Sequence, residues 1–397
     1  MNRRNLGTSS GRREKAVDKS AMERMVRQNR ARRKKRRKDK SISLAATMSK
    51  NVIALATSLH GIGPLIQNGT FRKRVAEIEP PWHPPRGFSL VPIEMPDFSM
   101  ELLLHQNEFF SNNSLEYLKT DDSNMPEDRA GKEDTAERLL TENREVVLQL
   151  HGGGYIGKMK NAYRDFAVLY ARMPGERAVL SVDYRVAPED PYPAALEDAY
   201  AAYQWLLEMG CRGSQIIVVG DSAGGGLALA LCLYLKDKGE PLPKKLVLMS
   251  PWTDLAATGD SYETNFEKDP LFGNTTDSMI YSNAYYGEND PKTPYISPLY
   301  GNYEGFPPML FQVGGSEMLL SDSARAAKKA KAAGCEVQLT IYDEMFHVFQ
   351  LGMKKMKESR EAWKEIEEFL NSLDRRIPMK KRYLLSLGTS TILLYYS

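Results

Sequence analysis

The stretch QIIVVGDSAGGGLALALCLYLKDKG (residues 215–239) joins two apolar runs through a turn of small residues. The first run predicts a buried strand over 215–220, and the second predicts a helix over 223–239. The turn between them, GDSAG (220–224), has the GxSxG pattern. Small residues are needed there because a sharp strand-to-helix turn crowds the backbone around its central residue. The hydroxyl of Ser222 is therefore predicted to lie at a helix N-terminus, which stabilises developing negative charge.

Similar apolar runs continue on both sides of this unit. Strands are predicted over 145–150, 178–184, 245–250, 308–314 and 337–343, with two further strands within 88–106. Helices are predicted over 161–173, 194–210, about 320–333 and 355–373, and one or two helices are predicted within 41–87. Continuous apolar strands that alternate with helices indicate an α/β fold with a parallel sheet covered on both faces. Ligands of such sheets bind beyond the carboxyl ends of the strands.

A second glycine cluster, HGGG (151–154), ends an earlier predicted strand. Attack of a serine on an ester carbonyl creates an oxyanion, which needs backbone N–H donors already aimed at it. We expect Gly152, Gly153 and Ala223 to form this oxyanion hole. We expect His151 to shape the loop rather than to act as the base. A phosphate-binding loop is the alternative, but neither GxGxxG nor GxxxxGK[ST] spacing is present.

A nucleophilic serine needs a base, and the base needs an orienting acid. In folds with this turn the chain order is serine, acid, histidine. Of the five histidines only His347 follows Ser222, so elimination selects it. The acid should follow the predicted strand over 308–314, as Glu317 and Asp322 both do. We favour Glu317, because Asp322 is predicted to lie in the following helix.

These segments together resemble the hormone-sensitive-lipase-like branch of the α/β hydrolases. The matching motifs are HGGG (151–154), DYRVAPEDPYPAALEDA (183–199), GDSAGG (220–225), SPWTDL (250–255), GSEMLLSDS (315–323) and FHVF (346–349). The resemblance implies a mostly parallel eight-stranded sheet, a serine–acid–histidine esterase site and an N-terminal helical lid. Most members have Asp where this chain has Glu317. The subgroup that resembles small bacterial acetyl-hydrolases and lactone hydrolases has Glu there, which favours short- to medium-chain esters, acetyl esters or lactones.

Charge is distributed unevenly along the chain. Residues 1–40 hold 17 Lys/Arg against four Asp/Glu, and the remaining residues hold 37 against 47. A solvated tail without a partner is one interpretation of this charge, and attraction to an anionic surface, lipid or nucleic acid, is the other. The charge distribution sets off a basic tail, disordered or helical, over 1–40. With the lid that the resemblance implies, three further segments are expected: a helical lid over 41–87, a catalytic domain over 88–375 and a C-terminal extension over 376–397.

We therefore expect a serine carboxylesterase that forms an acyl-enzyme intermediate and needs no metal or organic cofactor. A ligand-binding receptor or scaffold on the same fold is the alternative, although such proteins commonly lack the histidine that this chain has. The chain has no CxxC pair among its three cysteines, which disfavours a zinc knuckle or a disulfide framework and suits a reducing compartment. We expect a cytoplasmic protein, with peripheral membrane attachment left open. The sequence leaves the oligomeric state open, and a dimer is compatible with it.

Overall fold

In the computed structural model, chain contacts divide the molecule into two units, Met1–Ser43 and Leu44–Ser397. The structure describes residues 42–57, 68–105, 144–175, 177–273, 278–281 and 283–372. All described helices and strands belong to the second unit. The predicted basic tail over 1–40 and the C-terminal extension over 376–397 lie outside the described residues.

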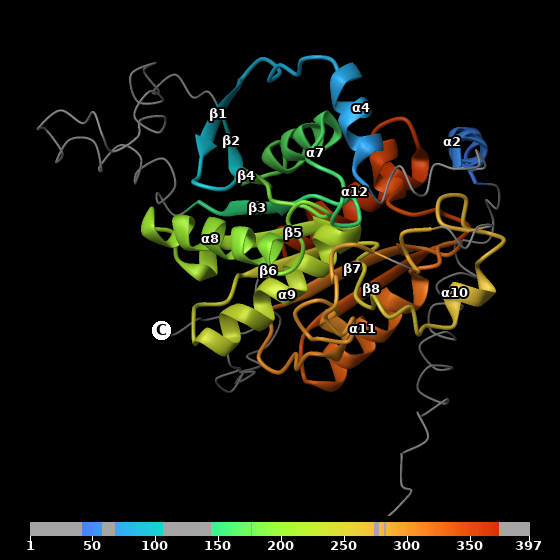
Figure 1. Ribbon diagram of the computed structural model, residues 1–397. Coiled ribbons are helices and arrows are strands. Elements are labelled where there is room, and N and C mark those ends of the chain that lie inside the picture. Colours follow the sequence, from blue (N-terminus) through green and yellow to red (C-terminus); the bar gives the residue numbers. More distant parts are fainter. Residues whose placement is uncertain are drawn as a thin grey trace, which may run out of the picture. The chain divides into compact units, whose positions relative to one another are not determined.

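Eight strands form one sheet in the order β1-β2-β4-β3-β5-β6-β7-β8 (Figure 1). They are β1 Phe88–Glu94, β2 Ser99–His105, β3 Val146–Leu150, β4 Ala178–Asp183, β5 Ile216–Asp221, β6 Lys245–Met249, β7 Met309–Gly314 and β8 Val337–Tyr342. β2 pairs antiparallel with both β1 and β4, and all other pairs are parallel. The predicted mostly parallel, eight-stranded α/β sheet is thus confirmed.

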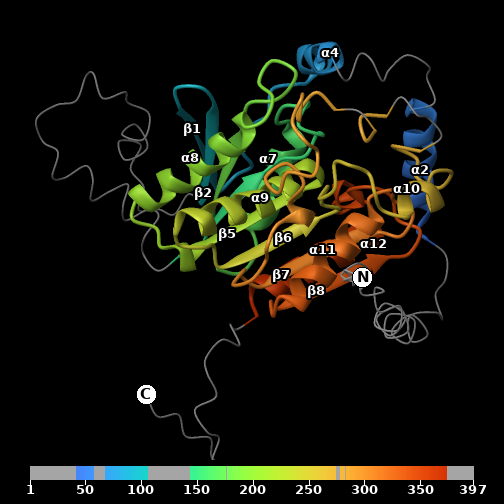
Figure 2. The ribbon, with the colours of Figure 1, turned by 60° about the horizontal axis from the view of Figure 1, so that its bottom comes forward.

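Helices cover both faces of the sheet (Figures 1 and 2). The larger core cluster includes residues of α8 Ala194–Glu208, α9 Ser222–Lys238 and α11 Leu320–Ala332. The smaller cluster, on the other face, includes residues of α7 Asn161–Ala171 and α12 Lys357–Leu370. The remaining helices among the described residues are α2 Leu44–Thr57, α4 Thr70–Ile78, α10 Ser261–Thr264 and the short 3-10 turns Gly213–Gln215, Pro298–Tyr300 and Phe349–Gly352. Within the described ranges, no helix is both long and apolar enough to cross a bilayer.

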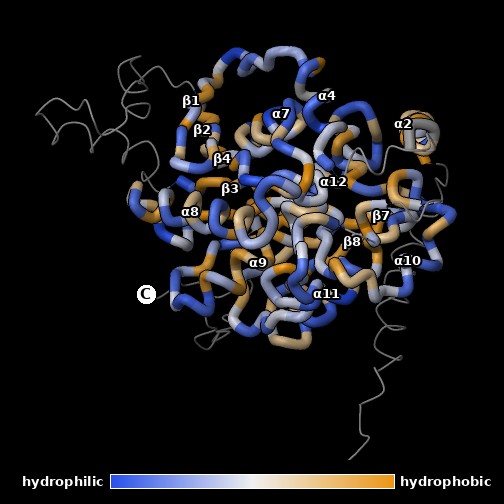
Figure 3. Tube along the Cα trace, viewed as in Figure 1, coloured by the Kyte–Doolittle hydropathy of each residue, from blue (hydrophilic) through white to orange (hydrophobic). Residues whose placement is uncertain are grey.

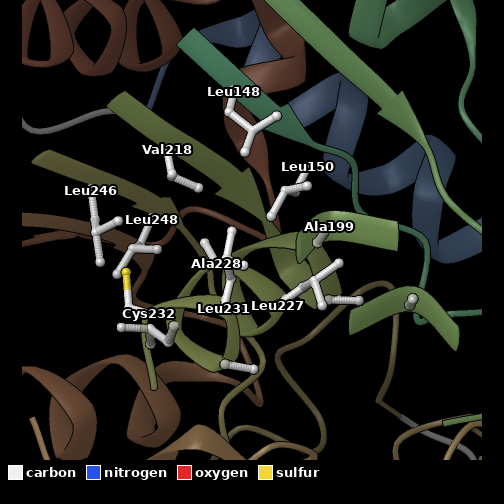
Figure 4. Close-up of a cluster of buried hydrophobic side chains, with 14 of the residues drawn as sticks. Leu148, Leu150, Ala199, Val218, Leu227, Ala228, Leu231, Cys232, Leu246 and Leu248 are labelled. Carbon is white, nitrogen blue, oxygen red and sulfur yellow. The ribbon is translucent and has the colours of Figure 1, made fainter. Parts of the chain in front are cut away.

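Helix α9 is apolar on nearly all sides and lies in the larger core cluster (Figure 4). Its Leu227 and Leu231 are fully buried and share the cluster with Leu148, Val218 and Leu248 of three adjacent strands. A helix without a polar face has to be buried. Each buried leucine contributes about 1.5–3 kcal/mol relative to an exposed one. This packing holds the junction between β5 and α9 in place, and Ser222 lies at that junction.

The carboxyl ends of β3, β5, β6, β7 and β8, which all run parallel, lie at one edge of the sheet. The glycine cluster follows β3, Ser222 follows β5 and Ser250 follows β6. Glu317 follows β7, and His347 follows β8. Residues that are far apart in the sequence are therefore brought to a common edge by the topology alone.

Candidate active site

Ser222 occupies the strained turn between β5 and α9. Its backbone has φ 52°, in the left-handed region that costs a residue with a side chain about 1 kcal/mol or more. The flanking glycines make the turn sterically possible. A Cβ at Gly220 would lie 2.3 Å from the carbonyl oxygen of Gly224, and a Cβ at Gly224 would lie 2.1 Å from that of Leu150. The GxSxG spacing is therefore a packing requirement of this turn.

Three side chains from three loops form one hydrogen-bonded chain beside that turn. His347 Nε2 lies 2.9 Å from Ser222 Oγ, and His347 Nδ1 lies 2.8 Å from Glu317 Oε2. The ring nitrogen that faces a carboxylate carries the proton, which leaves Nε2 free to accept the serine hydroxyl. Ser222 and His347 are 6% and 7% exposed, and Glu317 is fully buried. The structure thus brings the predicted serine, histidine and first-choice acid together.

The surroundings of His347 raise its proton affinity. Burial by itself lowers the pKa of this imidazole, but the hydrogen bond and the charge of Glu317 oppose burial. The more distant charges of Asp269 and Asp221 act in the same direction as Glu317, and the pKa ends above its ordinary value of 6.5. The ring of Phe272 packs edge-on against the imidazole at 4.8 Å between centroids and helps to keep water away from it.

The second carboxylate oxygen of Glu317, which faces away from His347, also accepts hydrogen bonds. Its Oε1 accepts a hydrogen bond from Ser250 Oγ at 2.7 Å and another from the backbone N–H of Gly314. Ser250 Oγ in turn accepts the backbone N–H of Val348, next to the histidine, at 3.2 Å. The carboxylate therefore has a fixed orientation toward His347.

Asp322, the second candidate for the acid, has another role in the structure. It lies in the first turn of α11, as predicted, and is fully buried. Its Oδ2 accepts the backbone N–H groups of Thr253 and Asp254, each at 2.8 Å. Burial, with a smaller effect from the charge of Asp254, raises the pKa of Asp322 to about 8. The carboxyl group of Asp322 therefore holds the loop after β6, and the carboxylate that contacts His347 is Glu317.

In the glycine loop after β3, the structure differs from the expectation that Gly152 is an oxyanion donor. The backbone N–H of Gly152 donates to Asp221 Oδ1 at 3.0 Å, so it is already engaged and does not serve as an oxyanion donor in this arrangement. Asp221 Oδ2 accepts the hydroxyl of Tyr163 at 3.3 Å, and the carboxyl group is buried. Burial raises its pKa to about 7, although the nearby His347 and the two hydrogen bonds lower it. Gly153, by contrast, is exposed at the turn of the loop, with φ 123°.

His151 packs inside this loop. Its ring stacks on Tyr184 with centroids 4.1 Å apart, and its Nδ1 lies 2.7 Å from the carbonyl oxygen of Gly152. Burial is the main cause that lowers the pKa of His151 to about 4, although the charge of Asp183 opposes it. A neutral, stacked imidazole that contacts the loop backbone agrees with a loop-shaping role.

A family model described as the alpha/beta hydrolase fold matches residues 147–351, a range that includes every residue of the candidate active site. The chain belongs to the α/β-hydrolase family. An acetyl-hydrolase of Streptomyces hygroscopicus is 39% identical over 227 residues, or 57% of this chain and 75% of that protein. An esterase of Acinetobacter venetianus is 37% identical over 246 residues, or 62% and 79%.

Solved structures place the protein more finely within the α/β hydrolases. The crystal structure of an esterase from the bacterial hormone-sensitive lipase family is 32% identical, with a TM-score of 0.66 over 83% of this chain and 98% of that one. An esterase/lipase from an uncultured bacterium is 29% identical, with a TM-score of 0.67 over the same shares. The predicted resemblance to the hormone-sensitive-lipase-like branch is confirmed.

Two polar side chains of this α/β hydrolase were not predicted as parts of the site. Asp221 holds the glycine loop through Gly152, and Ser250 orients the acid Glu317. The sequence contains information from which both residues could have been predicted. Asp221 lies inside the GDSAGG motif, and Ser250 begins SPWTDL, directly after a buried strand at the same sheet edge. A polar residue in that position is a candidate for the site whatever its chemistry.

Proposed function

We propose that this α/β hydrolase is a serine carboxylesterase in which Ser222, His347 and Glu317 form the catalytic triad. The hydrogen-bonded chain from Oγ through the imidazole to the carboxylate carries this proposal. A non-catalytic receptor would have no use for a histidine held between a strained serine and a buried carboxylate. Ester hydrolysis as the reaction is also supported by the similarity to proteins named acetyl-hydrolase and esterase.

The proposed reaction has two halves. His347 Nε2 takes the hydroxyl proton as Ser222 Oγ bonds to the acyl carbon, and the same nitrogen then protonates the departing alcohol. A water molecule, deprotonated by His347, then attacks the acyl carbon, and His347 returns the proton to Ser222 Oγ as the bond to the acyl group breaks and the carboxylic acid leaves. Glu317 keeps the ring in the required tautomer and stabilises its charged form.

Backbone N–H groups would hold the oxyanion in both halves. We keep Gly153 and Ala223 as donors and replace Gly152 by its neighbour Gly154, because the N–H of Gly152 is engaged by Asp221. Ala223 is the second residue of α9, so its N–H belongs to the first turn, where N–H groups have no intrahelical acceptor. The loss of one such donor typically costs about 10²- to 10³-fold in kcat.

Asp221 should act as a positioning residue for this loop. In Asp221→Ala the loop loses its link to Gly152, and we expect kcat to fall by about 10- to 100-fold with little change in KM, because small misplacements of donors have costs of this size. Asp221→Asn keeps an oxygen that can accept the same N–H, so it should retain most of the activity. Tyr163→Phe is the matched control, because it removes only the other hydrogen bond of the carboxyl group. Equal kcat values in Asp221→Ala and wild type would contradict the role.

We propose small acyl esters or lactones as the substrate class. Glu317 in the acid position and the similarity to an acetyl-hydrolase support this choice. Hydrolysis of p-nitrophenyl acetate, butyrate and decanoate, and of γ-butyrolactone, would test it. We expect kcat/KM for acetate or butyrate to exceed that for decanoate by about tenfold or more, since pocket fit discriminates on this scale. A preference for decanoate would contradict the substrate class, and no hydrolysis of any ester would contradict the function.

We also propose that residues 41–87 form a lid for the catalytic domain over 88–375. The helices α2 and α4, which are the ones described in this segment, contact loops near the site. Lys50 of α2 donates to Ser316 Oγ at 3.2 Å, directly before Glu317 in the chain. Arg72 of α4 donates to the carbonyl oxygen of Ile156, in the turn after the glycine cluster, at 2.7 Å. These links tie the lid segment to the acid loop and to the oxyanion loop.

We propose the cytoplasm as the place of action. Cys211, Cys232 and Cys335 lie in the described part of the chain and form no disulfide with one another. Burial raises the pKa of Cys211 to about 11 and that of Cys232 further, which keeps both groups as thiols. A chain that keeps its cysteines reduced suits a reducing compartment.

A further inference from the structure

The segment NFEKDPLFG (265–273), which follows α10 directly, contacts both the loop of Glu317 and the ring of His347. We call it the α10 loop. Figure 3 shows hydrophilic stretches of chain around α10. Two polar side chains of the α10 loop are nevertheless buried: Asn265 is 4% exposed, and Asp269 is fully buried. Burial of polar groups is costly unless hydrogen bonds satisfy them, so their partners show what the loop holds.

The peptide bond that follows Glu317 is held at both of its polar groups. Asn265 Nδ2 donates to the carbonyl oxygen of Glu317 at 2.8 Å, and to that of Gly315 at 3.2 Å. Asp269 Oδ2 accepts the N–H of Met318, the next residue, at 2.7 Å. The backbone N–H of Asp269 donates to the carbonyl oxygen of Asn265 at 2.9 Å, which fixes the spacing of the two side chains. The α10 loop therefore holds the backbone of the acid in place.

The other carboxylate oxygen of Asp269 holds the turn that covers His347. Its Oδ1 accepts the backbone N–H groups of Leu271 at 2.8 Å and of Phe272 at 3.1 Å. An aspartate that accepts N–H groups two and three positions further along the chain stabilises a local turn. The ring of Phe272 lies edge-on to the imidazole, with 4.8 Å between centroids. One side chain thus links the loop of the acid to the aromatic cover of the base.

The charge of Asp269 also acts on the imidazole. Backbone N–H groups bind both oxygens of this carboxyl group, an arrangement that suits an ionised carboxylate. Burial lowers the pKa of His347, and three carboxyl groups oppose it. Glu317 acts through its hydrogen bond and its charge, and Asp269 and Asp221 act through their charges. All three favour the imidazolium, which is the form that His347 takes after it accepts a proton.

We propose that Asp269 is a positioning residue of this hydrolase, which fixes the Glu317 loop and the Phe272 turn around His347 and adds a negative charge beside the imidazolium. Asn265 shares the hold on the Glu317 loop. Asp269 acts through Glu317 and His347 rather than on a reacting atom. The expected effect on rate rests on the proposed function, because small misplacements of catalytic groups are costly only where there is a reaction. The effect on the proton affinity of His347 can be measured without any ester.

Asp269→Asn tests the proposal, because the amide has no charge and can accept N–H groups at one of its two ends only. We expect the pKa of His347 to fall, as followed by NMR titration of the imidazole, with His347→Gln to assign the signal. For p-nitrophenyl butyrate, kcat should fall about 10- to 100-fold with KM within about twofold. Only the neutral ring acts as a base, so the acid limb of kcat/KM should move to lower pH.

Asn265→Ala is the companion variant, because it removes the hold on the carbonyl oxygen of Glu317 without any change of charge. We expect kcat to fall about tenfold. The pKa of His347 should stay at its wild-type value, since Ser250 and Gly314 still hold the carboxylate. Asp322→Asn is the matched control. This buried carboxyl group also accepts two backbone N–H groups, but it belongs to the loop after β6 and should leave the pKa of His347 unchanged.

Far-ultraviolet spectra and thermal midpoints establish which variants fold. A folded Asp269→Asn protein with an unchanged pKa of His347 would overturn the proposal whatever its kcat, as would an equal fall of that pKa in Asp322→Asn. If Asp269→Asn did not fold, a wild-type kcat in Asn265→Ala would overturn it. A wild type that hydrolyses no ester, together with a lowered pKa of His347 in Asp269→Asn, would reject the proposed function and leave the positioning role in place.

Discussion

Replacement of Ser222 by alanine is expected to lower kcat for p-nitrophenyl butyrate by about 10⁵- to 10⁶-fold. The variant keeps the turn, since alanine differs from serine only by the hydroxyl group. It removes the atom that would bond to the acyl carbon and the proton that His347 Nε2 would accept over 2.9 Å. The residual rate would come from binding and from the oxyanion donors, which act on a water molecule as well. Steady-state kinetics at saturating ester measure the change.

Ser214→Ala is the matched control for this prediction. Ser214 is an exposed serine in the turn directly before β5, so it precedes the same strand–turn–helix unit without touching the site. Its replacement should leave kcat within about twofold, as for most surface substitutions. A fluorophosphonate should label the wild type and Ser214→Ala at Ser222 and should leave Ser222→Ala unlabelled. A Ser222→Ala protein that keeps a tenth or more of the wild-type rate would refute the nucleophile.

The strands could be predicted because the sheet is covered on both faces. The strand predicted over 215–220 corresponds to β5 Ile216–Asp221, which is buried along its whole length, so the apolar run alone was enough to predict it. Strand direction carries no such signal. β1 and β2 pair antiparallel at one edge of the sheet, with mixed burial along each strand. Whether such a strand runs with or against its neighbour depends on the connection between them, which composition does not reveal.

The site could be predicted as far as chain order and spacing determine it. His347 followed from elimination, and Glu317 followed from its place after a strand. The expectation for Gly152 failed because its amide meets a carboxylate 69 positions away in the chain. The link between Ser250 and Glu317 likewise spans 67 positions. Such pairings depend on how two loops pack across neighbouring strands, and neither loop shows its partner in its own sequence.

Glu317→Gln is expected to lower kcat by about 10³- to 10⁴-fold and to change the pH dependence of what remains. The amide has no charge to stabilise the imidazolium, and it can present an N–H to the ring and so favour the wrong tautomer. In the wild type, Glu317 raises the pKa of His347 against the effect of burial. Only the neutral ring acts as a base, so wild-type activity should fall as the pH drops through a pKa above 6.5. Without the carboxylate the pKa falls, and the acid limb of the kcat/KM profile should move to lower pH.

Asp322→Asn distinguishes this effect from the general loss of a buried carboxyl group. With its pKa raised to about 8, Asp322 is mostly neutral at pH 7, so asparagine is a close replacement that can still accept the N–H groups of Thr253 and Asp254. It should leave the acid limb where it is in the wild type and reduce kcat by less than about tenfold. If Asp322→Asn moved the limb and Glu317→Gln did not, the acid would be assigned to the wrong residue. Since Glu317 alone of the two contacts His347, only its loss should change the proton affinity of the ring.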